Sequence, residues 1–246
     1  MYKNISEAIE LANGITRELF KLDFEAVDVV VCPPFTALSE VAEVLSESDI
    51  GLGAQDMYWQ EEGAFTGEVS VKMLKDAGCQ YVIIGHSERR QFFAETNETV
   101  NKKLKTALKH GLTPIVCVGE NLHEREAGKT FEVIQDHIKN GLVDISIEDM
   151  YKTVIAYEPV WAIGTGKTAT AEQAQEVHKY IRDLLRKIYG DDLAESVRIQ
   201  YGGSVRLENI AELIAKPDVD GALVGGASLK IETFTAIVTK ASEVKK

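Results

Sequence analysis

The sequence predicts an α/β fold in which helices cover a parallel sheet. Segments with apolar residues at helical spacing alternate with short β-branched runs along the whole chain. The short runs show little in-and-out alternation, which is typical of strands buried on both faces. Strict alternation implies parallel strands joined by helical crossovers. The length of 246 residues fits an eightfold β/α barrel. A doubly wound open sheet is the rival architecture.

The chain opens with a helix, because Ile5, Ala8 and Ala12 recur at helical spacing. Asn4 and Glu7 form a capping-box pattern at its start. Further helices are predicted at residues 37–45, 100–108 (closed by Gly111) and 174–185 (opened by Thr170 and Gln173).

Seven short apolar runs between the helices are predicted as strands. They span residues 27–32, 50–54, 81–85, 113–118, 153–157, 197–201 and 222–224. Eight helical segments are predicted beside these seven strands. A closed eightfold barrel would need one more strand, ahead of the first helix. Because there is no linker or low-complexity stretch, we expect one domain over residues 1–246.

Composition argues against several classes of protein. Lys and Arg number 27 against 39 Asp and Glu, so the net charge is −12 and a general attraction to nucleic acid or an anionic membrane is not expected. No apolar run approaches a membrane span, and the N-terminus lacks a signal-peptide pattern, so we expect a cytoplasmic protein. The distant Cys32, Cys79 and Cys117 predict reduced thiols, without a disulfide frame or a zinc site.

Catalytic groups of β/α barrels lie at the carboxyl ends of strands, so the residues after each strand are candidates. His86 follows the third strand where a helix starts, and a helix N-terminus favours a neutral imidazole that can donate to a carbonyl. A histidine satisfied within a turn is an equally good interpretation.

Glu158 follows the fifth strand, where a buried carboxylate is costly without a task or a partner. The loop after it, with Trp161 near its start and Gly164 within it, predicts a lid that closes over Glu158. The alternative is an ordinary surface loop beside an ion-paired glutamate.

Paired glycines follow the last two strands, in the runs Gly202-Gly203-Ser204 and Gly225-Gly226. They let backbone N–H groups approach an anion closely, and these two loops commonly bind phosphate in β/α barrels. Tight-turn glycines are the alternative.

Sharper motifs are incomplete. The segment 164–168 lacks the first glycine of a P-loop, and His123-Glu124 lacks the second histidine of a zinc-protease motif. We expect His110, His137 and His178 at the surface.

Together these pieces resemble the triosephosphate isomerase family over nearly the whole chain. The runs that carry the resemblance are Ile84-Gly85-His86-Ser87-Glu88-Arg89-Arg90, Ala156-Tyr157-Glu158-Pro159-Val160-Trp161-Ala162-Ile163-Gly164-Thr165-Gly166, Tyr201-Gly202-Gly203-Ser204-Val205 and Val224-Gly225-Gly226-Ala227-Ser228-Leu229.

The resemblance implies a TIM barrel that interconverts dihydroxyacetone phosphate and glyceraldehyde 3-phosphate without cofactor or metal. It makes Glu158 the base and neutral His86 the group that polarises the carbonyl. Backbone amides at Gly164, Ser204, Gly225 and Gly226 would hold the phosphate, with no need for cationic side chains.

The resemblance also implies a homodimer. Residues 55–70, from Gln55 to Ser70, look like the family's long third loop, which reaches into a partner subunit. Exposed aromatic side chains on a long loop favour an interface, whereas the alternative is a loop folded onto its own barrel.

The family's first strand, with an Asn and a catalytic Lys, has no counterpart ahead of Met1, so we expect the true product to begin upstream. Two other functions stay open. One is a catalytically impaired, phosphate-binding remnant, because the Lys is absent. The other is a different β/α-barrel enzyme with a phosphate site, which would act on an indole or ribose phosphate. The combination of Glu158, its lid and His86 argues against this second function.

Overall fold

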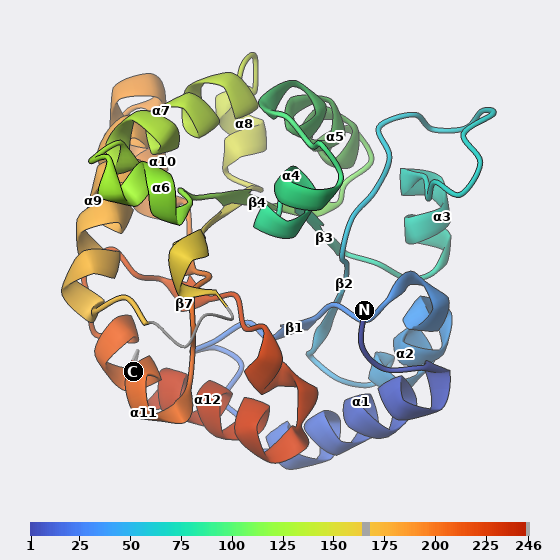
Figure 1. Ribbon diagram of the computed structural model, residues 1–246. Helices are drawn as coiled ribbons and strands as arrows, with labels where there is room; N and C mark the ends of the chain where they lie inside the picture. Colours follow the sequence, from blue (N-terminus) through green and yellow to red (C-terminus); the bar gives the residue numbers. More distant parts are fainter. Residues whose placement is uncertain (164–167, 245–246) are drawn as a thin grey trace.

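The computed structural model describes residues 1–163 and 168–244, and in this part of the chain seven parallel strands form one sheet. The strands pair in chain order from β1 to β7 and lie in the middle of Figure 1, with helices around them. Their bounds are Val30–Val31 (β1), Gly51–Ala54 (β2), Tyr81–Ile84 (β3), Thr113–Val118 (β4), Val154–Tyr157 (β5), Ile199–Tyr201 (β6) and Gly221–Ala222 (β7). The predicted α/β barrel architecture is confirmed.

The prediction of eight helices is too low, because the described residues contain twelve α-helices and three short 3₁₀ helices. The α-helices are Ile5–Leu19 (α1), Leu38–Leu45 (α2), Val71–Asp76 (α3), Ser87–Phe92 (α4), Asn97–Lys109 (α5), Leu122–Glu126 (α6), Thr130–Gly141 (α7), Ile147–Met150 (α8), Ala171–Tyr189 (α9), Asp191–Ser196 (α10), Leu207–Ile214 (α11) and Ile231–Val244 (α12). The 3₁₀ helices are Phe35–Ala37 (η1), Val160–Ala162 (η2) and Gly226–Leu229 (η3).

Local capping chemistry sets where the longer helices begin. Asn4 accepts from the backbone N–H of Glu7 at 3.0 Å, and Glu7 accepts from the N–H of Asn4 at 2.8 Å. Thr170 and Gln173 make the same exchange at the start of α9. These side chains satisfy N–H groups that have no partner within the helix, as the sequence predicts.

The sheet separates two apolar cores. The larger core lies between the strands and the helices, where residues such as Ile134 and Ile155 are fully buried and each contributes about 1.5–3 kcal/mol. The smaller core comprises Ile83, Ile115, Cys117, Val154 and Ala156. Its members alternate along β3, β4 and β5 with residues of the larger core, as expected for side chains that line the inside of a barrel.

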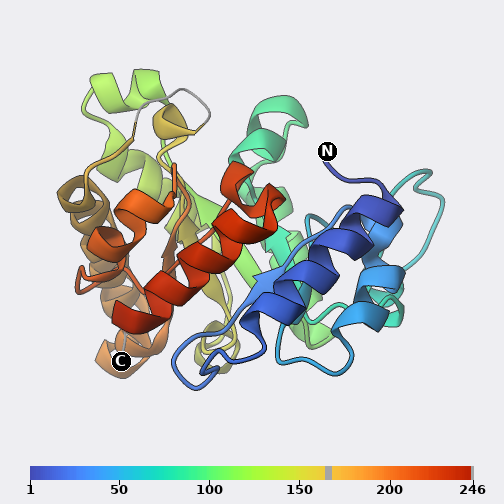
Figure 2. The same ribbon diagram turned by 90° about the horizontal axis from the view of Figure 1, so that it is seen from below.

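The strands β1 and β7 stand at the two ends of the strand order. The strand predicted at 27–32 is longer than the observed one, because only Val30–Val31 forms a strand. This strand is half-buried and, among the described residues, pairs only with β2. The helices α1 and α12 lie side by side over this region (Figures 1 and 2). Gly14 of α1 has no room for a side chain, because a Cβ there would lie 2.2 Å from the Cδ1 of Ile231.

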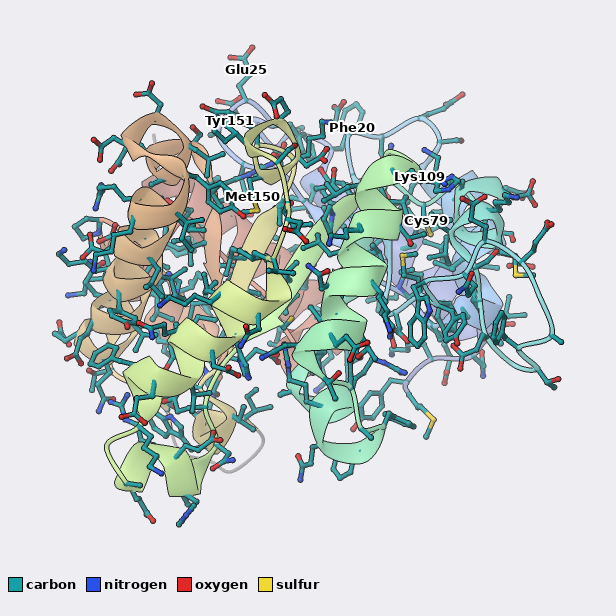
Figure 3. The ribbon with its side chains drawn as sticks, turned by 90° about the horizontal axis from the view of Figure 1, so that it is seen from above. Phe20, Glu25, Cys79, Lys109, Met150 and Tyr151 are labelled. Atoms are coloured by element: carbon teal, nitrogen blue, oxygen red, sulfur yellow. The ribbon has the colours of Figure 1, made fainter. Side chains whose placement is uncertain are left out.

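The two ends of the sheet carry different loops. Phe20, Met150 and Tyr151, which lie in connections that lead into strands, are at one end in Figure 3. The helices α4 and α6, which follow strands, lie at the opposite end. Within the described residues, no helix combines the length and apolar character needed to cross a membrane.

Candidate active site

Glu158 lies directly after β5 and is only 2% exposed. Its Oε2 accepts from the backbone N–H of Ser87 at 2.9 Å, and its Oε1 accepts from the Ser87 hydroxyl at 3.0 Å. These donors satisfy a carboxylate that would otherwise be costly to bury. Ser87 was missed as a functional residue in the sequence, although it follows His86 directly at the end of β3.

His86 joins Glu158 from the end of β3, with its Nε2 3.0 Å from Glu158 Oε1. The backbone N–H of Glu88 donates to His86 Nδ1 at 3.3 Å, so the proton of the neutral ring lies on Nε2 and points to the carboxylate. Burial lowers the pKa of His86, but its hydrogen bond to Glu158 and the nearby negative charges outweigh burial and raise the pKa above its usual value.

The glycine turn after β6 also meets Glu158. A Cβ on Gly202 would lie 3.0 Å from Glu158 Cγ, so a side chain there would push against the carboxylate-bearing chain. Ser204 follows, and its carbonyl accepts from Asn209 Nδ2 at 2.9 Å. A carboxylate and an imidazole N–H, both mostly buried and in mutual contact, can remove a proton from carbon beside a carbonyl whose oxygen the imidazole polarises.

The remaining predicted phosphate ligands are less closely tied to this pair. Gly225 and Gly226 are exposed at the start of η3, and a Cβ on either would meet open space. In the described part of the chain, neither glycine has a hydrogen bond to Glu158 or His86. Gly164 lies outside the described residues.

Gly119 and Glu120, which follow β4, were missed in the sequence. A Cβ on Gly119 would lie 1.8 Å from the Glu158 carbonyl oxygen, so the two main chains are in direct contact. Fully buried Glu120 accepts from Trp161 Nε1 at 2.9 Å and from the Tyr157 hydroxyl at 3.1 Å. Burial raises the pKa of Glu120, while the Trp161 hydrogen bond opposes this. The position of Glu120 directly after β4 was a usable signal in the sequence, whereas the close approach of Gly119 is evident only in the folded chain.

A buried ring of charges holds α4, the helix that begins after His86. Lys103 Nζ lies 2.7 Å from Asp56 and 2.9 Å from Glu95, and Arg89 Nε lies 2.9 Å and 3.0 Å from the same two carboxylates. Desolvation raises the pKa of Asp56, although Lys103 and Arg89 counteract it. The ring joins α4 and α5 to Asp56, near the start of the 55–70 loop.

The prediction that three histidines lie at the surface is wrong for His178, and His137 and His110 are only partly exposed. His178 is fully buried within α9, and burial lowers its pKa to about 4. His137 of α7 is mostly buried, and burial together with the charge of Arg90 lowers its pKa to about 3. His110 is part-buried, with Nε2 3.0 Å from Glu61 Oε1. A neutral imidazole can lie on the inward face of a helix. The polarity of histidine alone is therefore a poor guide to its exposure.

The three cysteines are free thiols. Cys117 is buried inside the sheet, and desolvation together with the Glu158 charge raises its pKa well above the usual value. In the part of the chain that the structure describes, no three His, Cys, Asp or Glu side chains come together in a way that could hold a metal ion.

Comparison with known proteins relates the chain to one family. A family model described as triosephosphate isomerase matches residues 1–241. The chain is 59% identical over 240 residues to the triosephosphate isomerase of Carboxydothermus hydrogenoformans, covering 97% of this chain and 94% of that protein. It is 55% identical over 238 residues to that of Alkaliphilus oremlandii, covering 97% and 95%. For Geobacter metallireducens the identity is 58% over 240 residues, covering 97% and 94%.

Proposed function

The chain belongs to the triosephosphate isomerase family, and from that premise we propose that Glu158 and His86 interconvert dihydroxyacetone phosphate and glyceraldehyde 3-phosphate. The observation that carries these roles is the 3.0 Å contact between His86 Nε2 and the buried Glu158 carboxylate. This acid–base pair is the well-known one of the family.

Glu158 removes a proton from the hydroxymethyl carbon beside the ketone and later returns it to the neighbouring carbon. The electron pair of the broken C–H bond forms a double bond between the two carbons, and the π pair of the carbonyl moves onto its oxygen, which gives an enediolate. The Nε2–H of His86 stabilises this oxygen by a hydrogen bond and helps the hydroxyl proton pass between the two oxygens. In the resting protein Ser87 holds Glu158 with two hydrogen bonds, so the carboxylate must leave Ser87 to reach the substrate.

The phosphate is held by backbone amides at Ser204, Gly225 and Gly226, while the fourth predicted ligand, Gly164, lies outside the described residues. Open space beside the two exposed glycines supports the approach of an anion. The bond from Asn209 fixes the main chain at Ser204. Oriented amide dipoles bind a dianion even in a chain with a net charge of −12.

The test is an isomerase assay with both triose phosphates. We expect turnover by the unchanged chain and a kcat about 10²–10³-fold lower for His86→Gln, because the donor aimed at the developing oxyanion is displaced. KM should change by less than about fivefold, since the lost hydrogen bond strengthens in the transition state. His123→Gln, which changes an exposed histidine of α6, is the control. A His86→Gln enzyme as fast as this control would contradict the assigned role.

We propose further that the chain works as a homodimer through the 55–70 loop. Residues 62–68 are exposed, and Phe65 is 40% exposed. The base of the loop is fixed: Thr106 Oγ1 donates to the Trp59 carbonyl at 2.9 Å, and Lys109 Nζ lies 2.6 Å from Glu61. Figure 1 shows the loop extending beyond α3 and α5. An anchored loop with an exposed aromatic tip supports insertion into a partner.

Sedimentation of Phe65→Asp tests the dimer. Burying a carboxylate at the centre of an interface should weaken self-association at least about thirtyfold, the equivalent of roughly 2 kcal/mol. Phe20→Asp is the matched control, because Phe20 is 83% exposed and lies at the end opposite α4 (Figure 3). Dimers that persist equally in both variants would exclude this loop as the interface.

Compartment and domain organisation complete the proposal. Three free cysteines support a reducing environment and hence the cytoplasm. One sheet surrounded by helices from Ile5 to Val244 supports a single domain.

A further inference from the structure

We propose that His137 is a positioning residue for the isomerisation: it fixes the main chain at Gly119, against which the backbone of Glu158 rests. The inference rests on the role of Glu158 proposed above. It starts from a mostly buried helix histidine that the proposed chemistry does not use.

The first step is the contact between the ends of β4 and β5. The N–H of Glu158 donates to the Val118 carbonyl at 2.8 Å, and the N–H of Val160 donates to the Glu120 carbonyl at 3.1 Å. Gly119 lies between these two bonds, and its Cβ position is only 1.8 Å from the Glu158 carbonyl oxygen. A displacement of Gly119 therefore moves the backbone that carries the catalytic carboxylate.

The second step is what holds Gly119 on its other side. Because parallel pairing directs the carbonyls of its neighbours toward β5, the Gly119 N–H points away from β5. There it donates to His137 Nδ1 of α7 at 3.3 Å. Helix α7 thus supplies the acceptor for a backbone N–H directly beyond the end of β4.

Arg90 holds the neighbouring strand ends in the same region. Its Nε donates to the Gly85 carbonyl at 2.9 Å, directly before His86, and its Nη2 donates to the Cys117 carbonyl at 3.3 Å. Arg90 thus holds the backbone that precedes His86. His137 holds the backbone of Gly119, which contacts the backbone of Glu158.

The acceptor role requires a neutral ring at His137. Burial lowers its pKa, the adjacent Arg90 charge lowers it further, and Asp136 opposes them only in part. The ring therefore keeps Nδ1 free to accept across the working pH range of a metabolic enzyme, and the proton lies on Nε2.

The test compares His137→Leu, which has no acceptor, with His137→Gln, whose carboxamide oxygen can accept from the Gly119 N–H. We expect His137→Leu to lower kcat about tenfold per folded active site with KM changed less than twofold, because a displaced carboxylate affects the transition state most. His137→Gln should lie within about threefold of the unchanged enzyme. The control is His123→Leu on the exposed face of α6, which should leave kcat unchanged.

Several outcomes would overturn the proposal. A His137→Leu enzyme with full kcat, or a glutamine variant as slow as the leucine variant, contradicts positioning through this hydrogen bond. If the leucine variant does not fold, the ¹⁵N chemical shifts of the His137 ring in the unchanged protein provide the test. We expect Nδ1 to carry no proton from pH 5 to pH 8. A ring that is protonated at Nδ1, or that titrates in this range, would refute the role. An unchanged chain without isomerase activity would instead refute the proposed function, independently of the ring shifts.

Discussion

Glu158→Gln is expected to lower kcat about 10³-fold, within the range of 10² to 10⁴ that a positioned general base contributes. The amide is similar in shape to the carboxylate and its oxygen can accept from Ser87, so the fold should be retained. What disappears is the basic oxygen that receives the proton from carbon. The measurement is kcat in both directions, together with deuterium uptake from solvent into the carbon-bound position, which should fall in parallel.

The control for this variant is Glu176→Gln, an exposed carboxylate of α9 whose loss should leave kcat within a factor of two. Thermal unfolding of both variants checks that the protein is folded. If Glu158→Gln kept a tenth or more of the activity, another group would have to be the base.

His137 and His178 should together lower the free energy of unfolding by about 4 kcal/mol between pH 7.5 and pH 5.0, about 2 kcal/mol for each ring. The folded pKa is about 3 for His137 and about 4 for His178, against 6.5 as the ordinary value. Below pH 6.5 the unfolded chain binds two protons that the folded chain does not, so stability is lost as the pH falls. The raised pKa of His86 acts in the opposite direction and reduces the total.

Urea unfolding at fixed protein concentration measures this dependence. His178→Gln and His137→Gln each should flatten the curve by about half, whatever their effect at pH 7.5, because each removes one of the two protons. His123→Gln, at an exposed position, should leave the slope unchanged. A stability that stays constant from pH 7.5 to pH 5.0 would show that the two rings already titrate normally in the folded state.

Most of the sheet was predictable because each buried strand is a short apolar run. All seven predicted strands overlap the observed ones, and β4 has the predicted bounds of 113–118. The edge strands β1 and β7 are shorter than predicted, since pairing on one side sustains fewer residues than side-chain propensity suggests. The helix α4 was predicted from its position after His86, but α6 and α8 were not resolved as separate elements, because four or five residues carry too little periodicity.

The site was predictable where position at a strand end carries meaning. Glu158 and His86 follow β5 and β3, and the structure brings them into contact. Gly119 carries no chemistry of its own, and its importance lies in a close backbone approach that only the folded chain contains. For His178 a usable signal existed, because Ala174 and Ile181 lie on the same helix face and are fully buried.

A ring of buried ion pairs connects the 55–70 loop to the active-site helix α4. It consists of Arg89, Asp56, Lys103 and Glu95. Asp56 lies at the root of the segment proposed to enter a neighbouring subunit, while Arg89 lies three residues after His86. The ring therefore connects that segment to the helix α4, which begins directly after His86. For a dimer formed through that segment, as proposed above, we expect dilution that separates the subunits to lower specific activity before any unfolding occurs.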